Sequence, residues 1–257
     1  MARSLSETRA LVVGGTAGIG LASARRLLDA GVRQMVLVGR SETRGQEAAA
    51  SLSRDFGTRV VFARADAGIP AEISAAVDQA VAEMGRVDFL LSCGGGDPLP
   101  RLLHNIPLEE VIPTITNIQA PVLLPARAVL DVMTRQGGGS IVCFASDAGK
   151  LATPGETPIG AAMASVMMFC RAMANEAKRN GIRVNCVTPS IVRGTPLYDR
   201  LMADPFCGKL FGRAEKLADL GVVEPDDLAD LVCFLASPAS AKMTAQCISV
   251  TGGISAL

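Results

Sequence analysis

The chain is poor in the side chains that most often carry acid–base and metal chemistry. Its 257 residues include one histidine, one tyrosine and no tryptophan. A histidine-based zinc site or a Ser-His-Asp triad would have only His104 available. This scarcity excludes mechanisms that need several imidazoles, and we expect no metal site.

Neither sign of charge dominates, and long apolar runs are missing. The 25 basic residues balance the 25 acidic residues, so no basic field attracts nucleic acid or an anionic membrane. Hydrophobic residues make up 49% of the chain, but their runs break well before the ~20 residues that a membrane span needs. We therefore expect a small-molecule substrate, with no nucleic-acid or membrane partner.

Cysteine pairs with metal-binding or redox spacing are also missing. The seven cysteines are widely spaced, form no Cys-x-x-Cys motif and lie mostly in apolar runs. This distribution is typical of reduced core residues. Residues 1–6 are not followed by the apolar region of a signal peptide. Both observations predict a cytoplasmic protein.

From residue 10 onward, short β-branched runs alternate with longer amphipathic stretches. This pattern is typical of β-α units repeated around a parallel sheet. Glycines 31, 85, 137 and 181 mark expected helix ends. We predict strands at 10–13, 34–38, 60–63, 87–92, 140–145, 183–187 and 247–250, and helices at 19–30, 42–56, 70–84, 108–136, 159–180, 196–220 and 225–236.

A glycine-rich turn joins the first predicted strand to the first helix, with glycines at 14, 18 and 20. Such a turn lets the backbone approach a pyrophosphate, which the N–H groups and dipole of the helix N-terminus then hold. The preceding strand, the following helix and a second strand about twenty residues further on favour a dinucleotide site. The candidate cofactor-binding residues here are Gly14, Thr16, Gly18, Ile19 and Gly20.

The end of the second predicted strand indicates which dinucleotide is bound. An acidic residue there would accept a hydrogen bond from a free ribose 2′-hydroxyl, whereas Gly39 and Arg40 offer room and a cation. Arg40 and Ser41, with Arg44 beyond them, favour a 2′-phosphate. We therefore expect NADP, with NAD as the alternative if Arg40 is only a solvated surface charge.

The motif Gly14-x-x-x-Gly18-Ile19-Gly20 resembles the cofactor motif of the classical short-chain dehydrogenase/reductase family, and the similarity covers essentially the whole chain. Asp66 matches the family's adenine-contacting Asp, Asn117 its active-site Asn and Ser146 its catalytic Ser. The resemblance implies an α/β fold: one Rossmann-like doubly wound parallel sheet with helices on both faces, forming a single domain over residues 1–257. It also implies a substrate loop or helix insertion near residues 190–220.

The residues that the family uses to move a proton are replaced in this chain. The resemblance implies a Tyr, its pKa lowered by a Lys four residues on, that protonates the substrate carbonyl while the nicotinamide passes hydride. Counting from Ser146 places Ile159 at the Tyr position and Met163 at the Lys position, and neither can exchange a proton. The segment after the fourth strand is altered too, leaving Gly94 and, near the late strand, Pro189 as cofactor-binding candidates.

Three interpretations fit this altered pocket. The first is an atypical NADP(H)-dependent oxidoreductase that reduces a small carbonyl, enoyl-thioester or imine compound with a proton from another group. The second is a non-redox catalyst or cofactor-binding scaffold, and the third is a catalytically silent partner subunit or regulator. For the first, the polar groups after the fifth strand are Asp147, Lys150, Thr153 and Glu156, while Ser146 and Asn117 could hydrogen-bond an oxyanion.

Each substitute acid has a structural alternative. Glu156 lies three residues before Ile159, but it could equally be a solvated charge that caps the next helix. Lys150 is more typical of a surface charge. Tyr198 could replace the missing acid, although a loop tyrosine more often packs or forms a lid. The candidate catalytic residues are therefore Ser146, Asn117, Glu156 and Tyr198.

Two other side chains are weaker candidates. His104 could contact substrate or serve as a structural partner, and Cys93 is more typical of inert packing than of a nucleophile. The helices near 108–136 and 159–180 carry apolar residues on more faces than one core can bury. The resemblance implies a homodimer or homotetramer formed through them, although their methionines could instead line a substrate channel.

Overall fold

The computed structural model describes residues 3–95 and 98–255. Seven strands form one sheet in the order β3-β2-β1-β4-β5-β6-β7, and every neighbouring pair is parallel. The strands are β1 (Arg9–Val13), β2 (Gln34–Gly39), β3 (Arg59–Arg64), β4 (Phe89–Ser92), β5 (Gly139–Phe144), β6 (Ile182–Pro189) and β7 (Cys247–Val250). This is the predicted doubly wound α/β sheet.

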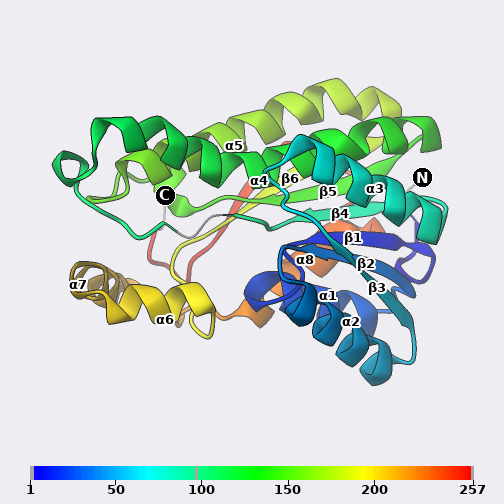
Figure 1. Cartoon of the computed structure of the whole chain (residues 1–257), viewed down its shortest axis with the longest axis horizontal. Coiled ribbons are helices and arrows are strands. Elements are labelled where there is room, and N and C mark those ends of the chain that lie inside the picture. Colours follow the sequence, from blue (N-terminus) through cyan, green and yellow to red (C-terminus); the bar gives the residue numbers. More distant parts are fainter. Residues whose placement is uncertain (1–2, 96–97, 256–257) are drawn as a thin grey trace.

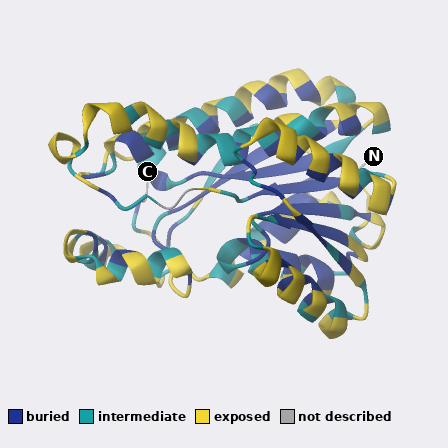
Figure 2. Ribbon diagram, viewed as in Figure 1, coloured by how far each residue is buried: buried dark blue, intermediate teal, exposed yellow. Residues whose placement is uncertain are grey.

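Helices cover both faces of the sheet (Figure 1). One face carries α3 (Pro70–Met84), α4 (Leu108–Gln136) and α5 (Thr157–Ala177), and the other carries α1 (Gly18–Asp29), α2 (Glu42–Phe56) and α8 (Pro225–Ala236). Alternate strand residues enter the two cores: Leu11 and Val13 face one, Ala10 and Val12 the other. Because both faces are covered, the inner strands β1, β4, β5 and β6 are nearly continuous buried runs, and Figure 2 shows a dark-blue centre.

The predicted helix at 196–220 is wrong in one respect, because the structure divides it into α6 (Pro196–Ala203), α7 (Pro205–Ala214) and a short 3-10 turn, η5 (Glu215–Leu217). The break lies at Asp204, whose backbone is extended and whose side chain accepts hydrogen bonds from the N–H groups of Phe206 and Cys207. A residue before proline avoids the helical region, and Asp is a favoured N-cap. We call residues 196–217 the lid.

Helix α4 is unusual because it contains Pro113, Pro121 and Pro125 within 29 residues. Proline has no N–H and removes one helical hydrogen bond at each site. The helix nevertheless runs continuously beside the sheet and packs along α5 (Figure 1). Because it borders both the core and the carboxyl ends of the strands, α4 supplies residues to both.

Apolar residues also remain exposed on these two helices, as the sequence predicts. Leu108 and Ile112 of α4 are 87% and 67% exposed, and Met168 of α5 is 60% exposed. The stretch 157–180 is long and apolar enough to cross a membrane by length and composition alone. In this fold it packs against the sheet, and the buried side chains of α5 join one of the two cores.

The cysteines behave as core residues, and no disulfide forms within the described part of the chain. Five are buried, and Cys93 and Cys247 are partly buried. Cys143, Cys186 and Cys247 are direct neighbours across β5, β6 and β7. The Cys170 thiol and burial raise the pKa of Cys186, so Cys186 is poor in the reactive thiolate form.

Candidate functional site

A cavity of about 1050 Å³ opens at the carboxyl ends of the strands. In open parallel sheets, ligands bind in the crevice outside these ends, where the strand order reverses. The reversal here lies between β1 and β4. We call the part around the glycine turn the nucleotide end, and the part beneath the lid the apolar end.

Backbone geometry shapes the nucleotide end. Gly14 has a φ of +81°, and a Cβ there would lie 2.6 Å from the carbonyl oxygen of Cys93. A Cβ on Gly20 would overlap the carbonyl of Gly14. Helix α1 starts at Gly18, and the Ala17 before it provides no side-chain cap. The first N–H groups of α1 are thus left for an anionic ligand in the cavity.

Cationic side chains border the nucleotide end beyond the turn. Arg40 and Arg44 are exposed and line the cavity together with Thr16, whose Oγ1 accepts a hydrogen bond from Arg44 Nε at 3.4 Å. Asp66 also lines the cavity, and its Oδ1 accepts a hydrogen bond from the Gly68 N–H at 2.9 Å. Ser41 is not part of the wall, because its hydroxyl caps α2 by accepting from the Arg44 N–H.

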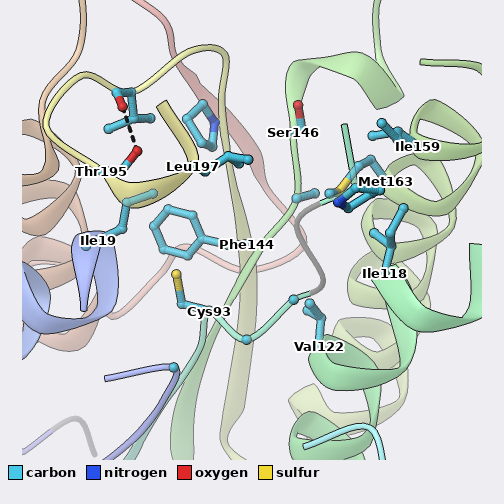
Figure 3. Close-up of a pocket in the computed structure, with 18 of the residues that line it drawn as sticks. Ile19, Cys93, Ile118, Val122, Phe144, Ser146, Ile159, Met163, Thr195 and Leu197 are labelled. Carbon is cyan, nitrogen blue, oxygen red and sulfur yellow. Dashed lines mark hydrogen bonds between the residues drawn. The ribbon is translucent and has the colours of Figure 1, made fainter. Parts of the chain in front are cut away.

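The middle of the cavity brings together the residues expected around a nicotinamide. Ser146, Asn117, Gly94 and Pro189 all line it. Ser146 Oγ accepts a hydrogen bond from the Ala148 N–H at 3.2 Å, which leaves the hydroxyl proton able to donate to a ligand. Figure 3 shows the Ser146 side chain among apolar neighbours contributed by α4, α5 and the lid.

An apolar cluster occupies the place where the resemblance puts a proton donor. Ile159 and Ala162 of α5 pack with Ile118 of α4, and Met163 packs against them. Ile159 and Met163 line the cavity and lie on the same side of it in Figure 3. Neither has a group that can exchange a proton, so any acid at this site must come from another segment.

Glu156 is the acidic side chain nearest in sequence to that cluster, and it lines the cavity. It takes the N-cap position of α5 but makes no side-chain cap hydrogen bond, and it is partly buried. The alternative of a solvated capping charge is therefore wrong. Burial raises its pKa from 4.5 to about 6, although a hydrogen bond with Thr153 offsets part of this rise. A carboxyl with this pKa can hold and release a proton near neutral pH.

Lys150 is not the surface charge that its sequence context suggests. Its Nζ donates to Thr188 Oγ1 at 2.8 Å, to Ser249 Oγ at 2.8 Å and to the carbonyl of Cys247 at 3.0 Å. Thr188 and Ser249 are register partners at the ends of β6 and β7. Sequence reasoning missed this cluster because strand pairing brings its members together, and the only signal was the hydroxyl at each strand end.

Asp147 belongs to the same cluster. The Ser249 hydroxyl donates to its Oδ1 at 3.3 Å, whereas Oδ2 has no hydrogen-bond partner among the described residues. Burial raises the pKa of this carboxyl, and the Lys150 charge opposes that rise. The cluster braces the segment that carries Ser146, and Lys150 itself does not line the cavity.

Tyr198 lines the cavity from α6, but its hydroxyl is already engaged. It donates to Glu215 Oε1 at 3.0 Å, and the same oxygen accepts from Arg193 at 3.0 Å. This arrangement ties α6 to η5 and matches the expected lid role. Leu201, Cys207 and Phe211 of the lid form a small core together with Ile191, which precedes it.

The two weaker candidates lie in different places. Cys93 lines the cavity beside Gly94, whereas His104 is exposed on a 3-10 turn and does not line it. The possible substrate contact of His104 is therefore wrong. Within residues 3–95 and 98–255, no three His, Cys, Asp or Glu side chains gather in a way that could hold a metal ion.

Comparison with known proteins gives the same picture over most of the chain. The family model described as "short chain dehydrogenase" matches residues 8–205. A 3-oxoacyl-(acyl-carrier-protein) reductase, FabG, from Chlamydia muridarum is 31% identical over 253 residues, which are 97% of this chain and 98% of that protein.

Solved structures extend the similarity to three dimensions. A short-chain type dehydrogenase/reductase from Mycobacterium marinum has a TM-score of 0.90 at 29% identity, covering 99% of this chain and 98% of the other. A gluconate 5-dehydrogenase from Burkholderia cenocepacia, solved with NADP and tartrate, has a TM-score of 0.85 at 28% identity and covers 98% of each chain.

Proposed function

The chain is an oxidoreductase that belongs to the short-chain dehydrogenase family, and from that premise we propose that it transfers hydride between NADP(H) and a small carbonyl, enoyl-thioester or imine compound. One observation carries this proposal. A single cavity joins the glycine turn to an apolar chamber, with Ser146 and Glu156 lining it. The dinucleotide and the substrate would thus meet beside a hydroxyl and a carboxyl.

The nucleotide end fits a dinucleotide. The open N–H groups of α1 and the glycine turn would hold the pyrophosphate, and Asp66 would contact the adenine. Arg40 and Arg44 line the cavity and offer two cations to a 2′-phosphate, and the residue directly after Gly39 is Arg40 rather than an acidic residue. The structure of the Burkholderia relative holds NADP, and that of another neighbour holds NADH, so the choice rests on Arg40 and Arg44.

The bound nicotinamide would supply or accept the hydride, and the chain's own residues would handle charge and protons. The Ser146 hydroxyl and the Asn117 amide would hydrogen-bond the oxygen on which negative charge develops. Protonated Glu156 would give its proton to the alkoxide oxygen of a reduced carbonyl compound or to the α-carbon of the enolate formed from an enoyl thioester, which completes a two-electron reduction. An iminium substrate already carries a positive charge and would need no proton at all. The Chlamydia relative's name, a 3-oxoacyl reductase, supports a carbonyl compound among the candidates.

Cofactor titration followed by a turnover screen tests the proposal. We expect NADPH to bind at micromolar concentration and more tightly than NADH, measured by calorimetry. Oxidation of NADPH should then follow with at least one of a ketone, an enoyl thioester and a cyclic imine. No binding of either nucleotide at millimolar concentration would contradict the proposal. Ile159→Tyr with Met163→Lys should add ordinary ketone reduction if the cavity is otherwise intact.

A second candidate function is favoured by the apolar cluster of Ile118, Ile159 and Ala162. A silent subunit or regulator would bind cofactor for shape and need no acid there. Binding of NADPH without turnover on any substrate would favour this alternative.

The exposed apolar residues of α4 and α5 support self-association to a homodimer or homotetramer, which light scattering would measure. The reduced, buried cysteines support a cytoplasmic location.

A further inference from the structure

The charged side chains around the apolar end are not all neutralised by partners. Arg101 pairs with Glu110 at 2.6 Å, and Arg193 pairs with Glu215 at 3.0 Å. Arg213 is exposed, lines the cavity and has no acidic partner in the described part of the chain. A guanidinium left unpaired at a cavity wall is available to a ligand.

Arg213 belongs to a basic stripe along the lid. Lys209, Arg213 and Lys216 follow one another at spacings of four and three residues, which places them on one side of α7 and η5. All three are exposed. The opposite side of α7 is apolar and carries the buried Cys207 and Phe211, with Leu210 and Ala214 lining the cavity. Helix α7 is therefore amphipathic, with an apolar side towards the chamber and basic residues along its outer edge.

The deep part of the apolar end has the opposite sign of charge. Gly155, next to Glu156 in the chain, lies against the ring of Phe206 in the first turn of α7, where a Cβ would come within 2.8 Å of it, and Glu156 is partly buried and lines the cavity there. Arg213 stands seven residues after Phe206, or about 10 Å of helix. The chamber between them is lined by Leu197, Leu201, Leu210, Phe211, Leu217 and Ile254. Its inner end is thus acidic and its mouth is basic.

We propose that the apolar end binds an anionic amphiphile, with the carbonyl-bearing apolar part inside the chamber and a carboxylate or phosphate held at the mouth by Arg213. The identity of the reacting end rests on the proposed function, but anion binding needs no hydride transfer. Glu156 repels an anion that enters head first, and Arg213 attracts one at the mouth. The two charges thereby fix the direction in which the substrate enters. Lys209 and Lys216 lie further along the rim, where the second charge of a phosphate would meet them.

Calorimetric titration with octyl compounds tests this polarity. Octanoate, octyl phosphate, octanol and octylamine each have eight carbons and differ in the charge of the head group. At low salt, we expect octanoate to bind more tightly than octanol, and we expect Glu156→Gln to weaken the binding of octylamine, whose ammonium pairs with the inner carboxylate. Arg213→Gln should weaken octanoate about tenfold, because a charge-assisted hydrogen bond is lost, and should leave octanol within twofold. Arg179→Gln, an exposed arginine on the turn after α5, is the matched control and should change neither.

Two further variants distinguish a phosphate head group from a carboxylate and control for misfolding. Lys209→Gln with Lys216→Gln should weaken octyl phosphate more than octanoate if a phosphate is the natural head group, and should affect both equally if a carboxylate is. Arg213→Lys should restore part of the octanoate affinity, and thermal unfolding should give the same midpoint for all variants.

Equal octanoate affinity in Arg213→Gln and Arg179→Gln would overturn the inference, as would octanol binding as tightly as octanoate in the native protein. The titrations are run with and without NADPH. If NADPH fails to bind while octanoate still depends on Arg213, then the proposed function fails and the anion site stands. If NADPH is bound and oxidised but the affinity for octanoate does not depend on Arg213, then the proposed function stands and the anion site fails.

Discussion

The nucleotide end and the apolar end of the cavity are built in different ways. The nucleotide end is made by backbone: a glycine turn with no room for a Cβ at Gly14 or Gly20, and the open N–H groups of α1. The apolar end is made by side chains on α5 and on the lid, which packs on the small core that it forms with Ile191. The shape of the nucleotide end depends on the path of the main chain, whereas the shape of the apolar end depends on the side chains that α5 and the lid carry.

This difference explains how the fold can be kept when side chains at the middle of the cavity are replaced. Ile159 and Met163 fit α5 without disturbing its packing, because the helix needs only small or apolar residues against α4. A comparable change at Gly14 would move two segments apart, since its neighbour is the main chain of Cys93. Backbone-built sites tolerate few substitutions, whereas side-chain sites can exchange their reactive groups one at a time.

The largest effect should therefore come from a single methyl group at the nucleotide end. Gly14→Ala places a Cβ against the Cys93 carbonyl at a φ of +81°. We expect a loss of about 3 kcal/mol in the free energy of unfolding and loss of measurable NADPH binding. Gly212→Ala, inside α7 where a Cβ meets nothing within 4 Å, should instead stabilise by roughly 0.5–1 kcal/mol. Thermal unfolding of the two variants measures both. Equal effects would mean that the two ends do not differ in this way.

The next largest effect should be on catalysis. Glu156→Gln keeps the shape of the side chain but removes the proton, so the rate of reduction should fall about 100-fold. With the pKa of Glu156 near 6, the native rate should decline as pH rises above that value, because less of the carboxyl is protonated. The variant should lose this pH dependence. A pH profile of kcat that is unchanged by the substitution would assign the proton to another group.

Glu156 should also affect stability with pH. Its folded pKa of about 6 is above the ordinary 4.5, so the native state holds a proton that the unfolded state has released between these values. The free energy of unfolding should therefore fall as pH rises from 4.5 to 6 and stay lower above 6. Solvent screening of this partly buried group limits the change to about 1 kcal/mol. Denaturant titrations at pH 4.5 and pH 8 should show a larger fall in the native protein than in Glu156→Gln, which keeps the other titrating groups, Asp147 among them.

A smaller effect is expected at the adenosine side of the nucleotide end. Arg40→Asp replaces a cation that lines the cavity by a carboxylate, which should weaken NADPH roughly 10- to 100-fold and strengthen NADH. Arg33→Asp provides the control, because Arg33 is exposed just before β2, at the far end of the same strand. Fluorescence titration with both nucleotides checks the outcome, and an unchanged preference would refute the role of Arg40.

The smallest effect should follow from Tyr198→Phe. Because the hydroxyl donates to Glu215 on the lid, its removal should cost about 1 kcal/mol of stability and change kcat less than threefold. Thermal unfolding and steady-state kinetics measure the two quantities. A loss of kcat as large as that in Glu156→Gln would make Tyr198 the proton donor. The lid would then take part in the reaction and would not be only structural.

Local periodicity was enough to predict most of the fold. The helices over 42–56, 70–84, 108–136 and 225–236 have the predicted bounds, since each is flanked by turn residues that interrupt its apolar pattern. The division at Asp204 was missed although Asp-Pro is a known helix start, because apolar residues continue on both sides of it.

The candidate site was only partly predictable for a different reason. The glycine turn is local, so its place at the cavity follows from spacing alone. The environment of Lys150 depends on Thr188 and Ser249, which lie on strands far along the chain. The pKa of Glu156 likewise depends on what the fold packs around it. Contacts between distant segments carry these properties, and single-sequence patterns do not encode them.

The prolines of α4 have one more consequence, and it concerns the main chain of Asn117. Pro121 stands four residues after Asn117 and has no N–H, so the Asn117 carbonyl receives no hydrogen bond from that position. Asn117 lines the cavity. Its peptide oxygen therefore lacks the hydrogen bond that residue 121 would donate in an uninterrupted helix. The missing hydrogen bond is a property of the main chain, so a replacement of the Asn117 side chain would not restore it.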